Sequence, residues 1–376
     1  MTNTLPTTLT HLGTMPVAEF IRDYWQQKPL LIRQAFPDFQ TPISAEEIAG
    51  LALEEEVESR LVVEEPDPNN PMASAWRMEH GPLDDNVFDG LPASHWTLLI
   101  QAVDQIFPTV HKLLNRFRFI PNWRLDDVMV SYAAAGGGVG PHFDYYDVFL
   151  LQAEGRRHWR LGQMANATSP LRDDTDMKIL TEFETSADWV LEPGDMLYIP
   201  PNLAHWGVAL DNCMTFSIGF RAPSHSDLLL EFSQAISEDL AADARFTDPG
   251  FPPQDNPGLI HASAIDQAAE ILRSLLDDKA KLAEWFGRYM TEPKRLAPTA
   301  DEPSDGLRLA AYSRAAYIPT EQGAQLFING ESAECSLALA QAICSYVALE
   351  PSDYSLDDQA LLEEAIAEGW LTDERG

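Results

Sequence analysis

Three side chains near the middle of the sequence have the types and spacing of a metal site. His142 and Asp144 lie two residues apart in Gly-Pro-His142-Phe-Asp144, and sixty residues separate Asp144 from His205. Two histidines and one carboxylate form a facial ligand set that is typical of non-haem Fe(II) and leaves positions open for a co-substrate and dioxygen. The sequence therefore predicts a catalytic metal centre at His142, Asp144 and His205 and, with iron bound, an oxygenase.

The segments around these ligands must bring them together. Because side chains alternate across a strand, His142 and Asp144 would point to one face of a strand over residues 142–152. The lead-in to His205, residues 193–201, is typical of a turn, one strand and a rigid Pro-Pro exit. The alternative is a hydrogen-bonded surface His142 and a core His205, but the joint pattern favours the metal site.

Arg157, which comes shortly after this predicted strand in the sequence, is a candidate cation for an acidic co-substrate. A molecule such as 2-oxoglutarate would chelate iron through its keto-acid end, and its distal carboxylate would pair best with a guanidinium. Arg157 shares a strand face with Trp159, whereas the neighbouring arginines share the other face. We expect Arg157 to point inward, with a hydroxyl of Ser131 or Ser217 beside it. The alternative is that these arginines all form exposed salt bridges.

The wider pattern predicts a β-sandwich or barrel preceded by helices. Residues 15–26 and a segment capped by Ser44 read as helices, residues 30–32 as a strand, and residues 95–107 as an apolar helix. From about residue 122 the apolar period becomes two, with turns at even spacing. The strand candidates are residues 125–132, 142–152, 158–161, 189–191, 196–199 and 214–220.

After Pro223 the pattern changes to helical. Ile265, Leu272 and Leu276 recur at helical spacing, either for a small core or for a dimer surface. Beyond a Pro-rich break, mixed strands and helices are compatible with a winged-helix fold. Residues 351–376 carry eight acidic side chains and one arginine. A nucleic-acid-binding wing needs basic residues, so we expect no direct nucleic-acid binding.

The composition limits the partners. The sequence has 25 basic and 59 acidic residues, a formal net charge of −34, which repels nucleic acid and anionic membrane and attracts a basic partner. Acidic solubility alone would give the same charge. The sequence contains no apolar run of transmembrane length and no secretory signal pattern. Cys213, Cys335 and Cys344 indicate free thiols of a reducing cytoplasm.

The motifs around the predicted ligands resemble those of the JmjC-type 2-oxoglutarate oxygenases of the cupin-like family, and within it the bacterial ribosomal oxygenase group. The resemblance covers essentially the whole chain, and one departure is His158, where relatives often carry another basic residue. The matching segments are His142-Phe-Asp144, Arg157, His205, Tyr24-Trp25-Gln-Gln-Lys28-Pro29-Leu-Leu-Ile-Arg33, Gly136-Gly-Gly-Val-Gly-Pro-His142, Tyr146-Asp-Val-Phe149 and Gly155-Arg-Arg-His-Trp159.

This resemblance implies an α+β fold with three parts. They are a double-stranded β-helix (jelly-roll) catalytic domain over residues 1–223, a helical dimerisation region over 224–294 and an acidic winged-helix-like domain over 295–376. It also implies Fe(II), 2-oxoglutarate and dioxygen as the reacting groups. The implied substrate is a basic large-subunit ribosomal protein, the universal protein numbered sixteen, hydroxylated at the β-carbon of an arginine by a cytoplasmic homodimer.

A bound arginine would need a carboxylate and an aromatic face. Asp127 shares a strand face with Ser131, and Tyr146 keeps the parity of His142 in the sequence. Asp127 with Tyr146 is therefore our candidate guanidinium clamp, and Ser217 on the last strand could join it. The alternative is that Asp127 caps a turn and Tyr146 only packs.

Other functions remain open from the residues alone. The chain could hydroxylate or demethylate another basic protein, or act on RNA, although its charge argues against RNA. It could also be a non-catalytic cupin-like binding scaffold. A cupin-type isomerase would leave Arg157 without a dicarboxylate to bind.

Overall fold

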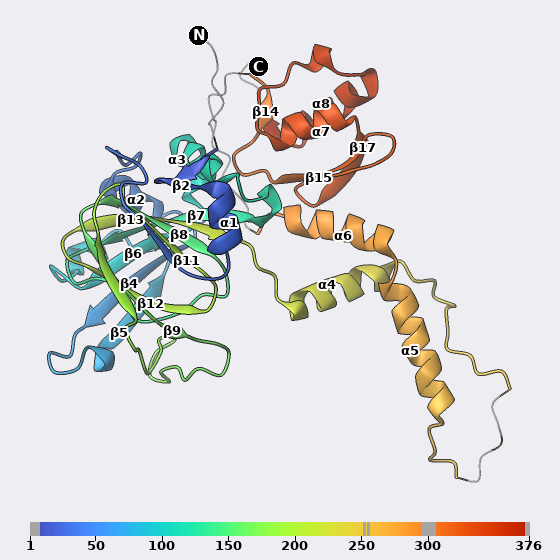
Figure 1. The fold of residues 1–376 in the computed structure, drawn as a ribbon, viewed down its shortest axis with the longest axis horizontal. Coiled ribbons are helices and arrows are strands. Elements are labelled where there is room, and N and C mark those ends of the chain that lie inside the picture. The colour runs from blue at the N-terminus through green and yellow to red at the C-terminus, as the bar shows by residue number, and fades with distance from the viewer. Residues whose placement is uncertain (1–7, 251–252, 254–255, 295–305, 373–376) are drawn as a thin grey trace.

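The computed structural model describes residues 8–250, 253, 256–294 and 306–372. It has a β-rich body, a helical region and a small C-terminal domain, as Figure 1 shows, and the predicted α+β class is confirmed. None of the described helices is long and apolar enough to cross a membrane.

The β-rich body consists of two antiparallel sheets. The larger has the order β3-β11-β8-β13-β7-β6-β4-β5, and the smaller has the order β10-β9-β12. The larger sheet contains β3 (Leu30–Ile32), β4 (Ser59–Glu65), β5 (Ala75–His80), β6 (Trp96–Ile100), β7 (Leu125–Ala133), β8 (Val148–Glu154), β11 (Met196–Ile199) and β13 (Cys213–Phe220). The smaller contains β9 (Arg157–Met164), β10 (Ala187–Leu191) and β12 (Leu203–Ala209).

Side chains alternate between two buried environments along the central strands. On β8, Phe149 and Leu151 pack in an aromatic core with Phe20, while Val148 and Leu150 line the space toward the smaller sheet. Because both faces of β8 are buried, its first four residues, 148–151, are all apolar. Short elements cover the outer face: β1 (His11–Leu12), β2 (Met15–Pro16), α1 (Val17–Asp23), α2 (Ala45–Leu51) and α3 (Pro108–Leu114).

The helix predicted over residues 95–107 is wrong. The chain forms β6 there, then a left-handed residue at Ala102 (φ 55°) and a short 3-10 turn at Val103–Gln105. β6 pairs with β4 on one side and β7 on the other, so its apolar run is buried on both faces. A short buried strand of this kind has the same apolar pattern as a buried helix, and sheet pairing decides between them.

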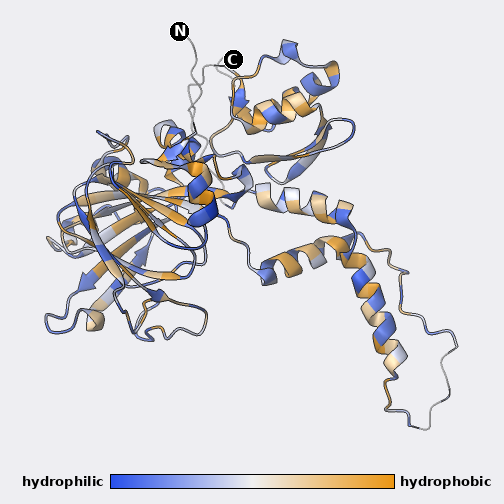
Figure 2. Ribbon diagram, in the orientation of Figure 1, coloured by the Kyte–Doolittle hydropathy of each residue, from blue (hydrophilic) through white to orange (hydrophobic). Residues whose placement is uncertain are grey.

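The helical region projects away from the body. It contains α4 (His225–Glu238), α5 (Ala262–Leu276) and α6 (Lys279–Thr291). The rings of Phe232 on α4 and Trp285 on α6 pack in a tilted arrangement with their centroids 5.0 Å apart. Helix α5 extends outward as an arm with no buried residue (Figure 1). Figure 2 shows apolar and polar residues alternating along this arm.

The C-terminal domain has its own apolar core, which includes Leu326, Leu339 and Leu362. It contacts the body through Arg118, whose guanidinium lies 3.5 Å from the Tyr346 ring centroid, and through the Asn122 side-chain amide, which donates to the Cys344 carbonyl at 2.6 Å. Its elements are β14 (Arg308–Leu309), β15 (Ala315–Pro319), β16 (Ala324–Ile328), β17 (Glu331–Cys335), α7 (Leu337–Cys344), α8 (Leu356–Ala367) and β18 (Leu371–Thr372).

Candidate active site

The three predicted ligands meet between the two sheets. One ligand atom from each of His142, Asp144 and His205 lies within 4.8 Å of the others. The His142 and His205 rings are 4.3 Å apart between centroids, and His205 Nε2 is 3.5 Å from an Asp144 carboxylate oxygen. Two imidazoles and a carboxylate at this spacing suit a single divalent metal ion.

Backbone hydrogen bonds hold the three ligand residues in place, although His142 and Asp144 do not lie on a regular strand. The expectation that His142 and Asp144 lie on one strand is wrong, because β8 begins only at Val148. Instead, His142 forms an isolated bridge with His205: each backbone N–H donates to the other residue's carbonyl, at 3.0 and 2.8 Å. Asp144 is fixed in turn because its carbonyl accepts from the Asn202 N–H at 2.7 Å.

Both histidines are oriented by backbone carbonyls. Nδ1 of His142 lies 2.9 Å from the Gly140 carbonyl, and Nδ1 of His205 lies 3.0 Å from the Leu203 carbonyl. Each Nδ1 therefore donates, which leaves Nε2 as the ligand atom. Burial and the neighbouring His142 lower the pKa of His205 to about 4, so that it is neutral and able to bind a metal at physiological pH.

The ligands open into a cavity of about 560 Å³. Residues from both sheets and from the segment before β8 line it, and its wall mixes apolar side chains with many charged and polar ones. The predicted co-substrate and substrate residues Arg157, Ser131, Ser217, Asp127 and Tyr146 all lie on its wall.

Arg157 is a buried cation at one side of the cavity. It is 3% exposed, donates to the Ser131 hydroxyl at 3.2 Å and approaches the Gly207 carbonyl at 3.5 Å. Its guanidinium also stacks over Trp159, 5.0 Å from the ring centroid. Burial lowers the pKa of Arg157, and among the described residues no carboxylate forms an ion pair with it.

Unpartnered polar atoms around Arg157 fit an anionic ligand. Nε of Arg157, Nε1 of Trp159 and the Thr97 hydroxyl are buried, line the cavity and have no hydrogen-bond partner among the described residues. Buried polar groups cost free energy when they are left unpaired. A small dicarboxylate that binds the metal at one end and Arg157 at the other would satisfy these donors.

Asp127 and Tyr146 also lie on the cavity wall, one buried and the other exposed. Asp127 is 3% exposed and accepts from the Gln101 side-chain amide at 2.9 Å. Tyr146 is 42% exposed, and burial of its hydroxyl together with the Asp144 charge raises its pKa. Ser217 is 8% exposed on β13. The parity assumed for Tyr146 does not hold as strand geometry, because residues 142–147 are not a regular strand.

Sequence reasoning missed the part of the cavity wall formed by β4 and β6. Arg60, Thr97, Gln101 and, on β7, Met129 all line the cavity. The signal was present as alternation: residues 97, 99 and 101 share one face. The prediction of a helix over residues 95–107 concealed it.

Comparison with known proteins agrees with this geometry. Residues 112–228 match the family model described as a JmjC domain, and residues 274–372 match the model of a ROXA-like winged helix. The ribosomal protein uL16 3-hydroxylase of Escherichia coli is 36% identical over 75% of this chain and 73% of its own length. A probable ribosomal oxygenase of Haemophilus influenzae is 33% identical over 83% of this chain and 80% of its own.

Solved structures extend the likeness to nearly the whole chain. Escherichia coli ribosomal oxygenase YcfD in complex with cobalt and 2-oxoglutarate has a TM-score of 0.81 at 31% identity, covering 97% of this chain and 99% of that one. A second structure of the same protein reaches a TM-score of 0.85 at 30% identity over 97% and 100%. The chain, with its His-Asp-His triad and its C-terminal winged helix, therefore belongs to the JmjC-domain ribosomal oxygenases.

Proposed function

We propose that this chain is an Fe(II)- and 2-oxoglutarate-dependent dioxygenase that hydroxylates the β-carbon of an arginine in ribosomal protein uL16. The observation that carries the proposal is one cavity that holds both the His142–Asp144–His205 group and the buried Arg157. The name of the E. coli relative supports the uL16 target. The net charge of −34 favours a basic protein partner and would make their association salt-sensitive.

In this proposal the residues of the chain bind and orient the metal and the co-substrate, which supply the reactive chemistry. Iron with 2-oxoglutarate, when bound, supplies the dioxygen chemistry that hydroxylates a carbon. His142, Asp144 and His205 would hold the metal through two nitrogens and one oxygen. Arg157 would pair with the distal carboxylate of 2-oxoglutarate, aided by the Ser131 hydroxyl and, on the neighbouring strand, by Ser217. Trp159 and the apolar wall would exclude water.

The clamp for the substrate arginine is part of the same proposal. The Asp127 carboxylate would accept hydrogen bonds from the guanidinium, and the Tyr146 ring would offer an aromatic face. Ser217 lines the same cavity and could donate or accept a further bond. The adjacent Asp126 is a poorer candidate, because Arg221, Lys294 and Arg314 already contact its carboxylate.

The test is a mass-spectrometric assay. The protein is loaded anaerobically with Fe(II), then given 2-oxoglutarate, air and a uL16 peptide that contains the arginine. The expected product carries one added oxygen on the arginine, and the same peptide with lysine in its place should react far less. Asp144→Ala should abolish product because it removes a metal ligand, whereas Asp239→Ala, an exposed aspartate paired with Lys281 on the helical region, should not.

Other outcomes would select another function. Succinate formation with no modified uL16 peptide, but with a modified peptide from another basic protein, would show that the substrate is that other protein. Bound metal without any 2-oxoglutarate turnover would favour the cupin-like binding scaffold.

We also propose that the protein is a cytoplasmic homodimer that joins through the helical region. The exposed apolar side chains of α5 support the dimer. The three free cysteines support a reducing compartment.

A further inference from the structure

β7 carries a bulge at the two aspartates beside the cavity. Asp126 and Asp127 lie opposite the single residue Gly219 of β13, because the register of the two strands shifts there. A bulge leaves part of the ladder unpaired and re-aims the side chains it carries, and bulges are frequent beside active sites. The conformation of this bulge therefore decides where the Asp127 carboxylate points.

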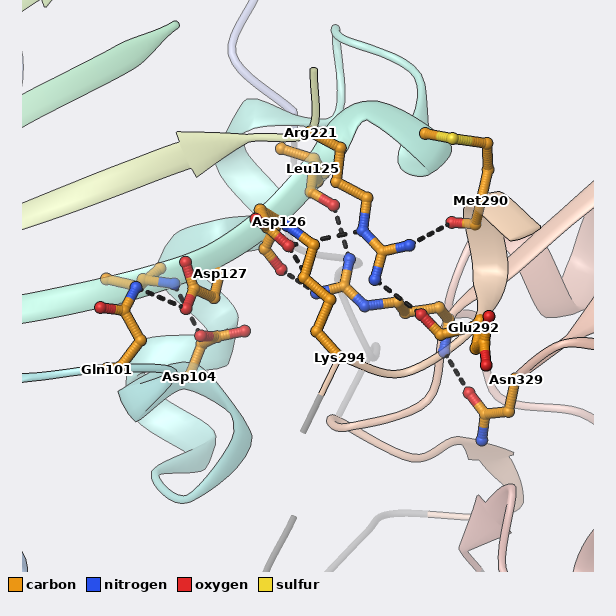
Figure 3. A network of polar contacts seen from close by, with 12 residues as sticks. Gln101, Asp104, Leu125, Asp126, Asp127, Arg221, Met290, Glu292, Lys294 and Asn329 are labelled. Carbon is orange, nitrogen blue, oxygen red and sulfur yellow. Dashed lines mark hydrogen bonds and ion pairs between the residues drawn. The ribbon is translucent and has the colours of Figure 1, made fainter. Parts of the chain in front are cut away.

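On the inner side, the bulge is held by residues of the body. The carboxylate of Asp104, which is 2% exposed, accepts from the Val128 N–H at 2.7 Å. The Gln101 side-chain amide donates to Asp127 at 2.9 Å. Figure 3 shows Gln101, Asp104 and Asp127 together at this end of the strand.

On the outer side, the bulge is held by the C-terminal domain. One guanidinium nitrogen of Arg314 donates to the Leu125 carbonyl at 2.6 Å, and the other donates to the Asp126 carbonyl and lies 3.4 Å from the Asp126 carboxylate. A guanidinium can contact all three oxygens because its N–H groups form a planar fork. These are the carbonyls at the start of the strand, where the ladder is irregular.

Arg314 is itself fixed within its own domain. Its backbone N–H donates to the Asn329 side chain at 2.8 Å, and the Asn329 N–H donates back to the Arg314 carbonyl at 3.0 Å. The Arg314 side chain is only 14% exposed. Arg314 therefore reaches β7 from a rigid hairpin of the C-terminal domain.

The helical region meets the same point. Arg221 contacts the Asp126 carboxylate at 3.4 Å and donates to the Met290 and Glu292 carbonyls at 2.9 and 2.7 Å, at the end of α6 (Figure 3). Lys294 also pairs with Asp126, and both line the cavity. The body, the helical region and the C-terminal domain thus converge one residue from Asp127.

We propose that Arg314 is a positioning residue for the peptide substrate: by binding the carbonyls of the β7 bulge, the C-terminal domain sets the direction of Asp127. This inference depends on the proposed function only for the identity of the peptide substrate. It gives the C-terminal domain a part in substrate selection, although none of its described residues, 306–372, lines the cavity.

The test compares Arg314→Ala with Arg288→Ala in the full chain. Arg288 also joins α6 to the C-terminal domain, through Glu331 and the Gly330 carbonyl, but does not contact β7. We expect Arg314→Ala to raise the peptide KM about tenfold or more, and to increase 2-oxoglutarate consumed per hydroxylated peptide, without a comparable rise in the 2-oxoglutarate KM. Hydrogen exchange of residues 125–130 should become faster in Arg314→Ala only.

An unchanged peptide KM and coupling in Arg314→Ala would overturn the proposal, as would an equal effect of Arg288→Ala, which would indicate general domain docking. If Arg314→Ala does not fold, Arg314→Lys decides: it keeps the charge but loses the fork, so an intermediate KM supports the proposal and a wild-type KM contradicts it. If the wild-type protein hydroxylates no arginine peptide, the proposed function fails instead, and hydrogen exchange alone decides whether Arg314 holds the bulge.

Discussion

Asp104 is a buried carboxyl group whose ionisation should oppose folding. Burial, and then the neighbouring Asp127 charge, raise the pKa of Asp104 to about 7, although the Val128 N–H and Arg314 favour the charged form. Because the folded pKa lies above the unfolded value of 3.8, the folded state retains a proton that the unfolded state has lost. Asp104 therefore contributes stability that declines as pH rises from about 4 to about 7.

The variant Asp104→Asn should remove this pH dependence. Asparagine keeps a carbonyl oxygen for the Val128 N–H but does not ionise. The variant should therefore gain about 3 kcal/mol of unfolding free energy relative to wild type between pH 5 and pH 8, about two pKa units. Urea unfolding at the two pH values measures the difference, and a constant difference would mean that Asp104 has the same charge at both.

The residue types and their spacing predicted the candidate site. They did not predict the residues whose role depends on their surroundings in the folded protein. His142, Asp144, His205 and Arg157 were found because their types and order carry the chemistry, and the structure brings them to one cavity. Asp104 and Arg314 gave no signal, since a carboxyl group's burial and a contact across 188 residues exist only after folding. The roles given to Ser131, Ser217, Asp127 and Tyr146 remain predictions.

At the scale of elements, two side chains of β9 lie so close to position 207 on β12 that a residue with a Cβ would clash with them. A Cβ on Gly207 would lie 2.7 Å from the Trp159 ring and 2.9 Å from Nε of Arg157. The two residues it would displace are those that we assign to the co-substrate. Gly207 therefore leaves room for the Trp159 and Arg157 side chains as they lie at the cavity.

We expect Gly207→Ala to weaken 2-oxoglutarate binding. Overpacking typically costs about 1–3 kcal/mol, so the Kd for 2-oxoglutarate should rise about tenfold or more, as measured by calorimetry on the metal-loaded protein. Gly50→Ala adds the same methyl group on α2, where a Cβ meets nothing within 4 Å, and should leave the Kd unchanged. An unchanged Kd in Gly207→Ala would show that the added methyl group is accommodated without displacing Arg157.

The order of the strands was predictable where the apolar pattern and the length of a segment both indicate a strand. The strands from β7 to β13 were largely predicted because turns separate short apolar runs. β4, β5 and β6 were missed. β6 pairs with β7, and β4 pairs with β6 and β5, and these pairings, which decide between a strand and a buried helix, form only on folding. The domain boundaries after residues 223 and 294 stay predictions.

At the scale of the whole molecule, the α5 arm is the feature that a single chain does not explain. Ile265 and Leu272 are 59% and 61% exposed, and α5 has no buried residue. A helix of this length is marginal in water unless an apolar face is covered. A second copy of the chain, with its own arm, is the partner that we propose to cover it.

The double variant Ile265→Asp/Leu272→Asp should therefore be monomeric. Light scattering after gel filtration should give twice 41.9 kDa for the wild type and 41.9 kDa for the variant, because each chain would have to bury two charges in the dimer. Asp266→Ala/Glu270→Ala, on the polar side of the same helix, should remain dimeric. A wild-type protein of 41.9 kDa at micromolar concentration would refute the dimer, and α5 would then need a different partner to cover its apolar face.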